Sequence, residues 1–428
     1  MTTQRLFVIV GVCAVVLFTF VTPPFQVPDE VGHFWRAESI AHGALFPPMT
    51  ARGAAAELPK GLASIVLVFW RTTPDFKITY DEFHRARWVR LEPETRVPVI
   101  LPAGYTPAPY IPQIVAATIG RVVHAIPVVT FYLGRLLNGL AFVAMVAMAI
   151  RIAPALRWVF AASGLLPMAM YLAASWSPDA MTIAASLLFT ALLLRGARTP
   201  REAALLSAAG AFVGLCKPAY FLIALLALVV PIVRGSYRAI IIAATAAGVA
   251  LAMWSAARAF VPARPGVRID PAAQIDCIRH DPGVFGDAIV HEARLHGLEY
   301  TEQGVGRLGL LDIRLPQAVI TAELLLLLLC AWSGVEAPRM PVRLLSLLIV
   351  AATVAGIALS SYLGWTAVCA RQIDGIQGRY FLPIVPLIFA VVSLPLVRRE
   401  AIPRIVLLTV SAAANATALA AVIARYYW

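Results

Sequence analysis

The sequence is poor in charged residues. Only 14% of its 428 residues are Asp, Glu, Lys or Arg, and lysine occurs only at positions 60, 77 and 217. Soluble proteins average about 25% charged residues, and 60% of this chain is hydrophobic, so the composition excludes a soluble globular protein. The net charge of +12 does not indicate nucleic acid as a partner. The arginines lie in short clusters between apolar runs, as in the loops of membrane proteins.

Features of other protein classes are also missing. The five cysteines have no metal-binding spacing, and the sequence has no internal repeat of the kind found in many transporters. No small-x-small cleavage site follows the first apolar run. We therefore predict that this run is an uncleaved span rather than a signal peptide. Cys277 and Cys369 are both expected in extracytoplasmic loops. The sequence leaves two alternatives for this pair: a disulfide between the two cysteines, or two free thiols.

Hydrophobic runs that are long enough, or nearly so, to span a bilayer recur along the whole chain. We count eleven: Leu6–Val21, Phe131–Ile150, Trp158–Ala174, Ala180–Leu194, Glu202–Leu215, Ala219–Val233, Ala239–Phe260, Gln317–Trp332, Leu344–Leu363, Tyr380–Val397 and Ile405–Ile423. The sequence therefore predicts an all-α polytopic membrane protein with about eleven transmembrane helices. Residues 1–428 are expected to form a single transmembrane domain.

The arginine clusters predict the orientation of these spans. Ile111–Val123 is a further apolar segment, but it is short and flanked by prolines, so we predict an interfacial or re-entrant helix there. The basic clusters and the amino terminus then all fall on the cytoplasmic side. Two large loop regions, 23–130 and 261–316, fall on the extracytoplasmic side and hold much of the polar sequence. We expect a multi-pass protein of a plasma membrane, of bacterial type, with any active site facing outward.

The first candidate site residues follow the first span. Pro28-Asp29-Glu30 suits the start of a helix, on which Asp29 and His33 share a face. Acids in a first turn also stabilise the helix dipole, so this window alone does not decide the function. Asp179 lies in a later connection on the same predicted side. Its Ser-Pro-Asp context fits an ordinary helix start, but an acid at the bilayer edge is also a candidate for a site.

Cationic and aromatic residues are expected at the same outer edge. They are Arg135, Lys217, Arg379 and Tyr380. Interfacial anchoring is the simple interpretation, and binding of a phosphate is the functional one. With the acids they form a predicted ring of carboxylates and cations that suits activation of a hydroxyl group and binding of a lipid phosphate. Glu323 lies inside a later span and is expected to be protonated or paired, with Arg258 as one candidate partner.

Several of these residues lie in motifs that occur in a fixed order. The motifs are Pro28-Asp-Glu-Val-Gly-His33-Phe-Trp, Tyr110-Ile-Pro-Gln113, Gly134-Arg135-Leu-Leu-Asn138, Ser175-Trp-Ser-Pro-Asp179-Ala, Cys216-Lys217-Pro218, Leu308-Gly-Leu-Leu-Asp312-Ile-Arg-Leu-Pro316 and Gln377-Gly-Arg379-Tyr380-Phe-Leu-Pro383. Over nearly the whole chain they resemble the membrane family called Domain of Unknown Function 2142. That family in turn resembles the C-type glycosyltransferase (GT-C) fold, which implies many spans and polyprenyl-phosphate sugar donors.

The resemblance implies roles for individual residues. Asp29 would be the general base on the acceptor hydroxyl, supported by Glu30. Asp179 would be a second acid that orients the acceptor or a metal. The substrate-binding residues implied are His33, Arg135, Lys217, Arg379 and Tyr380, with Lys217 and Arg379 on the donor phosphate. Some members of the fold use a divalent cation, such as Mg²⁺ or Mn²⁺, but no metal ligands are assigned here. One departure is Leu310, where the resemblance implies an aromatic residue after Gly309.

We therefore expect an integral-membrane glycosyltransferase that moves a sugar from a polyprenyl-phosphate donor to an extracytoplasmic acceptor. The acceptor would be a glycan, lipid or protein of the cell envelope. One alternative is a transporter or flippase for a lipid-linked sugar or polymer, which would place its ionisable groups near the bilayer midplane. The other is a non-catalytic membrane scaffold, which would tolerate replacement of Asp29 and Asp179.

Overall fold

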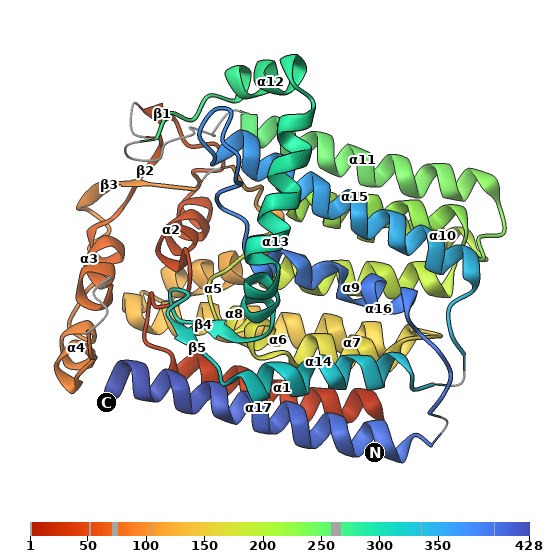
Figure 1. The fold of residues 1–428 in the computed structure, drawn as a ribbon. Helices are drawn as coiled ribbons and strands as arrows, with labels where there is room; N and C mark the ends of the chain where they lie inside the picture. The colour runs from red at the N-terminus through yellow and green to blue at the C-terminus, as the bar shows by residue number, and fades with distance from the viewer. Residues whose placement is uncertain are drawn as a thin grey trace.

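The computed structural model describes residues 2–50, 53–70, 76–102, 104–257, 267–334, 336–397 and 399–428. These residues are mostly helical, with little sheet, as the sequence predicts. Figure 1 shows the long helices running in a common direction, with shorter helices and strands gathered at one end of the bundle. The two termini lie at opposite ends of the long helices (Figure 1).

Within the described residues, five helices are long and apolar enough to cross a bilayer. They are α1 (Thr3–Val21), α6 (Pro127–Ile152), α11 (Gly235–Ala257), α15 (Met340–Gly364) and α17 (Ala401–Tyr427). Together they support a multi-pass membrane protein. The prediction of eleven transmembrane helices is not confirmed, because the other apolar runs form shorter or interrupted helices.

Proline accounts for much of this interruption. The shorter elements are α7 (Arg157–Leu165), α8 (Pro167–Ala173), α9 (Asp179–Arg195), α10 (Pro200–Cys216), the 3₁₀ helix η2 (Pro218–Leu228), α14 (Gln317–Ala331), the 3₁₀ helix η3 (Gly378–Ile384) and α16 (Val385–Val391). Leu166 has extended backbone angles and separates α7 from α8, because a following proline disfavours the helical conformation. Pro383 lies inside η3 and removes a backbone donor from that segment.

The first large loop region, residues 23–130, forms a compact layer at one end of the bundle (Figure 1). It contains α2 (Glu30–Ala41), α3 (Lys60–Phe69), α4 (Tyr80–Ala86), the 3₁₀ helix η1 (Ala108–Tyr110), α5 (Ile111–Val122) and the antiparallel strands β1 (Met49–Thr50), β2 (Gly53–Pro59) and β3 (Arg96–Ile100). At 12 residues, α5 is about 18 Å long, too short for the roughly 30 Å of a bilayer core. This length agrees with a helix that does not span.

This first region is also fastened to the end of α17. Lys77 Nζ donates hydrogen bonds to the carbonyl oxygens of Ala424 and Arg425, both at 3.0 Å. The backbone N–H of Ile78 donates to the carbonyl oxygen of Tyr426 at 2.7 Å. These bonds satisfy carbonyl groups that the last turn of a helix leaves without partners.

The second large loop region contains α12 (Pro271–His280), α13 (Gly283–Gly306) and the short strands β4 (Arg307–Leu308) and β5 (Ile313–Arg314). Figure 1 shows α13 running across the direction of α14, α15 and α16. Cys277 of α12 forms a disulfide with Cys369, which follows α15. Of the two alternatives left open by the sequence, the disulfide is therefore the one found.

Small residues allow the helices of the main core to approach closely. A Cβ atom at Gly139 of α6 would lie 2.3 Å from Val15 of α1, and one at Gly164 of α7 would lie 2.8 Å from Phe7. Close backbone approach of this kind is typical of helix packing in membranes.

We predict that Gly139→Ala destabilises the protein by about 1–3 kcal/mol, because the added methyl group overpacks the contact between α1 and α6. Thermal unfolding of the purified protein in detergent measures the effect. Gly356→Ala in α15 is the matched control, since a Cβ atom there meets nothing within 4 Å. Equal melting temperatures for the two variants would contradict this account of the core.

Candidate functional site

Asp29 occupies a strained position at the start of α2. Its φ angle is 62°, in the left-handed region, and its side chain makes no capping hydrogen bond to the helix. Left-handed backbone is uncommon outside glycine and often marks functional positions. The carboxylate instead accepts a hydrogen bond from Arg379 Nη2 at 2.6 Å, and the Asp29 side chain remains 62% exposed.

Arg379 also faces a second carboxylate. Its Nε lies 3.3 Å from Asp179 Oδ2, and Lys217 Nζ lies 3.4 Å from Asp179 Oδ1. We call Asp29, Asp179, Lys217 and Arg379 the charged cluster. The sequence predicted that these four side chains lie on the same side of the membrane, and the ion pairs confirm that they meet.

Each member of the charged cluster lies at or beside a helix terminus. Asp29 precedes α2, Asp179 is the first residue of α9, Lys217 follows α10, and Arg379 is the second residue of η3. The apolar runs of the chain can therefore stay within the bundle while these four polar side chains converge where the helices end.

The charged cluster leaves hydrogen-bonding capacity unused. The Arg379 side chain is 4% exposed, yet its Nε and Nη1 have no hydrogen-bond partner among the described residues, although Nε is within ion-pair distance of Asp179. Buried donors without partners are rare because they cost roughly 1–3 kcal/mol each. An anionic ligand beside Arg379 would satisfy them. Lys217 Nζ lies 4.0 Å from the centre of the Tyr380 ring, a cation–π contact that holds the ammonium group at the site.

His33 lies near the two acids, on the side facing Tyr105 and Tyr110. Its Nδ1 is 2.7 Å from the Tyr110 hydroxyl, and its ring packs edge-on against Tyr105. Burial lowers the pKa of His33 to about 4, although Asp29 and Asp179 act in the opposite direction. The imidazole is therefore neutral at pH 7, so His33 offers a hydrogen bond rather than a positive charge.

Tyr105 is a part of the site that sequence reasoning missed. Lys217 lowers the pKa of its phenol, but burial and Asp179 outweigh that effect and raise the pKa to about 12. The phenol is thus neutral and lies within electrostatic reach of the charged cluster. Its position in a long loop gives no spacing signal, and the one clue in the sequence is the second tyrosine five residues later.

Arg379 also sets the ionisation of Asp29. Desolvation by the surrounding protein raises the pKa of Asp29, but the positive charge of the Arg379 guanidinium is the largest effect in the opposite direction, and the pKa lies below its ordinary value of 3.8. Asp29 is therefore ionised at neutral pH. As long as Arg379 pairs with it, its affinity for a proton is weak.

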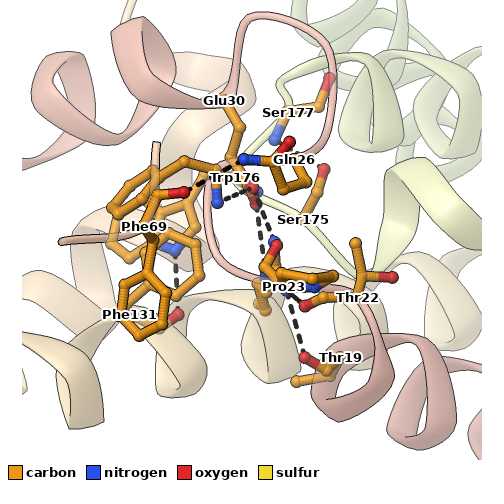
Figure 2. Close-up of polar contacts among 12 residues, drawn as sticks. Thr19, Thr22, Pro23, Gln26, Glu30, Phe69, Phe131, Ser175, Trp176 and Ser177 are labelled. Carbon is orange, nitrogen blue, oxygen red and sulfur yellow. Dashed lines mark hydrogen bonds and ion pairs between the residues drawn. The ribbon is translucent and has the colours of Figure 1, made fainter. Parts of the chain in front are cut away.

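Glu30, the neighbour of Asp29, is buried in an ion pair with Arg135. Arg135 Nε and Nη2 donate to its two oxygens at 2.9 and 2.7 Å, and both side chains are 0% exposed. Arg135 also donates to the carbonyl oxygens of Thr22 at 2.6 Å and Pro23 at 3.0 Å. Figure 2 shows Glu30 among the residues of these turns.

The Glu30 carboxylate also joins two turns of the chain. It accepts a backbone hydrogen bond from Phe25 at 3.0 Å. It accepts another from Trp176 at 3.1 Å (Figure 2). One turn leads to Asp29 and the other leads to Asp179. Gly134 makes room for this arrangement, because a Cβ atom there would lie 2.2 Å from the Trp176 ring.

This geometry bears on two of the roles expected from the sequence. Glu30 was expected to support the base and Arg135 to bind substrate. Both side chains are fully buried, and their charged atoms are occupied by each other and by the backbone. They hold the turns that present the candidate acids, and neither is offered to a substrate.

A set of side-chain acceptors on α12 and α13 fixes the segment before Arg379. Gln303 accepts the N–H of Gly378 at 2.9 Å, Glu292 accepts the N–H of Ile373 at 3.1 Å, and Gln274 accepts the N–H of Cys369 at 2.9 Å. The disulfide at Cys369 acts on the same segment. Sequence reasoning did not identify these contacts, because nothing in the spacing links α13 to η3.

The described residues do not fit a dedicated divalent metal site. No three His, Cys, Asp or Glu side chains among them come together in a group that could hold a metal ion. Asp29 and Asp179 are each paired with a cation of the protein, whereas Mg²⁺ and Mn²⁺ prefer several oxygen ligands.

Glu323 lies apart from the charged cluster, in α14. It is 0% exposed, and neither carboxylate oxygen has a hydrogen-bond partner among the described residues. Arg258, its candidate partner from the sequence, lies outside the described residues.

A family model described as "Predicted membrane protein (DUF2142)" matches residues 12–388. The chain belongs to the DUF2142 family. The resemblance to DUF2142 is thereby confirmed, and membership supports a membrane protein whose function the family description leaves open. No curated protein and no solved structure matches this DUF2142 chain.

We predict that Glu30→Gln lowers the free energy of unfolding by about 3–5 kcal/mol, because it leaves the buried Arg135 charge without a counter-charge. Lys60→Ala is the control. It removes an ion pair with Glu92 whose side chains are 50% and 43% exposed, and such pairs contribute only about 0–1 kcal/mol. Unfolding in detergent compares the two variants. Similar stabilities would show that the Glu30–Arg135 pair does not hold the turns.

Proposed function

We propose that this DUF2142 protein is an integral-membrane glycosyltransferase that moves a sugar from a polyprenyl-phosphate donor to a cell-envelope acceptor. Its active site would face the extracytoplasmic side of a bacterial plasma membrane. The observation that carries the proposal is the charged cluster, in which one buried arginine is shared by two carboxylates and retains unused donors. The acceptor would be a glycan, lipid or protein.

In this proposal Arg379 and Lys217 bind the donor phosphate. A guanidinium group can donate two parallel hydrogen bonds to a phosphate, and an ammonium group adds a second positive charge. Tyr380 keeps Lys217 in place through its ring. As the sugar is transferred, negative charge builds up on the leaving phosphate, and these cations stabilise it where it develops.

Asp29 acts as the general base, since its carboxylate is the exposed member of the charged cluster. It takes the proton of the acceptor hydroxyl while that oxygen forms a bond to the anomeric carbon. The bond between the anomeric carbon and the phosphate oxygen breaks, and the phosphate leaves with the electron pair. Asp179 orients the two cations and the acceptor, and His33 contributes a neutral hydrogen-bonding group beside Tyr110.

Donor binding also activates the base. In the free protein the Arg379 guanidinium holds the pKa of Asp29 low. When the donor phosphate takes over part of that guanidinium, Asp29 loses some of its electrostatic stabilisation and its pKa rises. The base is thus strongest when the donor is in place, which limits proton uptake by Asp29 in the absence of substrate.

The two alternatives fit the same observations less well. A transporter or flippase would place its coupling groups near the bilayer midplane on broken helices, whereas the charged cluster lies where helices end. A scaffold would not require a buried arginine with unused donors. Replacement of the two acids separates a scaffold from an enzyme.

We predict that Asp29→Asn lowers kcat by about 10²–10⁴-fold, the usual contribution of a general base, and that Asp179→Asn also lowers turnover. The assay incubates purified protein with a panel of polyprenyl-phosphate sugars and detects products by mass spectrometry. Melting temperatures should stay close to that of the wild type for Asp29→Asn, because its side chain is exposed.

Asp81→Asn, at an exposed acid of the same loop region, is the matched control and should transfer sugar at the wild-type rate. Full activity of the Asp29 and Asp179 variants would favour the scaffold. If the wild-type protein neither bound nor turned over any donor of the panel, the proposal of a glycosyltransferase would be wrong.

We predict different pH profiles for kcat/KM and kcat. A general base must be deprotonated, so activity falls as the pH drops through its pKa. The kcat/KM profile reports the free protein, in which the pKa of Asp29 lies below 3.8, so it should stay flat from neutral pH to about pH 4. The kcat profile reports the donor complex and should decline at a higher pH. Coinciding acid limbs would refute activation of the base by the donor.

A further inference from the structure

A cavity of about 440 Å³ lies between α13 and the helices that it crosses. Its walls include Ile289 and Ala293 of α13, Leu324 and Leu327 of α14, and Ile388 and Phe389 of α16. The few side chains with polar groups in the lining are Glu292, Tyr300 and Thr301, all on α13. This volume falls within the range of small-molecule sites, roughly 300–1,000 Å³, but the lining suits a hydrocarbon rather than a polar ligand.

The cavity and the charged cluster are separated by one turn of η3. Gly378 and Leu382 line the cavity, and Arg379, between them in the chain, pairs with Asp29 and Asp179. The backbone of Gly378 is pressed against α13, since a Cβ atom there would lie 2.0 Å from the carbonyl oxygen of Tyr300. Because Gly378 and Leu382 flank Arg379 in the chain, an apolar chain in the cavity and an anionic head group on Arg379 can belong to one molecule.

We propose that this cavity binds the phosphate-proximal part of the donor's isoprenoid chain while Arg379 and Lys217 hold its phosphate. The occupant is a single unsaturated hydrocarbon chain attached to a phosphate. This inference rests on the proposed function for the sugar that the donor carries, but binding of the lipid phosphate is independent of transfer.

Binding of the chain in the cavity depends on shape and van der Waals contact rather than on the hydrophobic effect. In a bilayer, moving a hydrocarbon chain from lipid to an apolar protein surface gains little hydrophobic free energy, because lipid tails are as apolar as leucine. Discrimination must come from shape and van der Waals contact with the walls. The cavity thus fixes the chain in one register, and that register places the phosphate against Arg379.

Two cavity-filling variants test the proposal. Ala293→Trp fills the cavity from α13 and Ile388→Trp fills it from α16; Ile388 is 37% exposed, so the folded core can accommodate the change. Leu298→Trp is the matched control, because Leu298 lies on α13, is 85% exposed and is outside the cavity lining. Binding of a sugar-free long-chain polyprenyl phosphate, and of a phosphate monoester without an isoprenoid chain, is measured by native mass spectrometry of the full-length protein in detergent.

Both cavity variants should bind the long-chain phosphate at least about tenfold more weakly than Leu298→Trp, as expected for a blocked apolar pocket. Binding of a phosphate monoester that carries no isoprenoid chain should be unchanged, because it does not occupy the cavity. Equal binding of the long chain by all three variants would overturn the proposal. The proposal would also be overturned if the cavity variants lost a co-purified phospholipid but bound polyprenyl phosphate as before. The occupant of the cavity would then be a membrane lipid.

A photoactivatable polyprenyl phosphate tests the wild-type protein directly and does not depend on the folding of any variant. Crosslinks are expected on α13, α14 and α16, and crosslinks confined to other segments would contradict the assignment. Binding and crosslinking without sugar transfer would support the proposed role of the cavity and contradict the glycosyltransferase activity. Sugar transfer at the wild-type rate by both cavity variants would support the glycosyltransferase activity and contradict the proposed role of the cavity.

Discussion

The buried pair of Glu30 and Arg135 is the contact on which the site depends. Its carboxylate accepts backbone hydrogen bonds from Phe25 and Trp176, and its guanidinium binds the carbonyl oxygens of Thr22 and Pro23. Two turns that are far apart in the sequence are thereby held together, and each carries one candidate acid. A charge pair without exposure costs desolvation, so its value here lies in geometry more than in stability.

That the members of the charged cluster lie together could be predicted because each loop of a membrane protein has only two possible sides. Once the arginine clusters fix the orientation, Asp29, Asp179, Lys217 and Arg379 must all lie at the same edge. The role of Glu30 could not be predicted in this way. Asp29 points toward solvent and Glu30 into the core, and the turn between them includes the positive φ of Asp29. Sequence periodicity does not report that angle.

The number of spans was harder to predict than their apolar character. Hydropathy identifies apolar runs but not the breaks within them, and Pro167, Pro218 and Pro383 interrupt or shorten several helices. The break at η3 is also what brings Arg379 to the charged cluster. The contacts of α13 with Gly378 and Ile373 could not be predicted either. A hydrogen bond between a side chain and a distant backbone group produces no periodic pattern in the sequence.

The bonds from Lys77 and Ile78 to the end of α17 bear on how the protein is assembled. Lys77 and its partner Ala424 are 347 positions apart in the chain, so the amino-terminal layer cannot reach its final arrangement until the last described helix has been inserted. Until then the carbonyl groups at the end of α17 lack these donors. Completion of the amino-terminal layer is therefore a late event in biogenesis, and chains shortened before α17 should expose an unfinished layer to quality-control proteases.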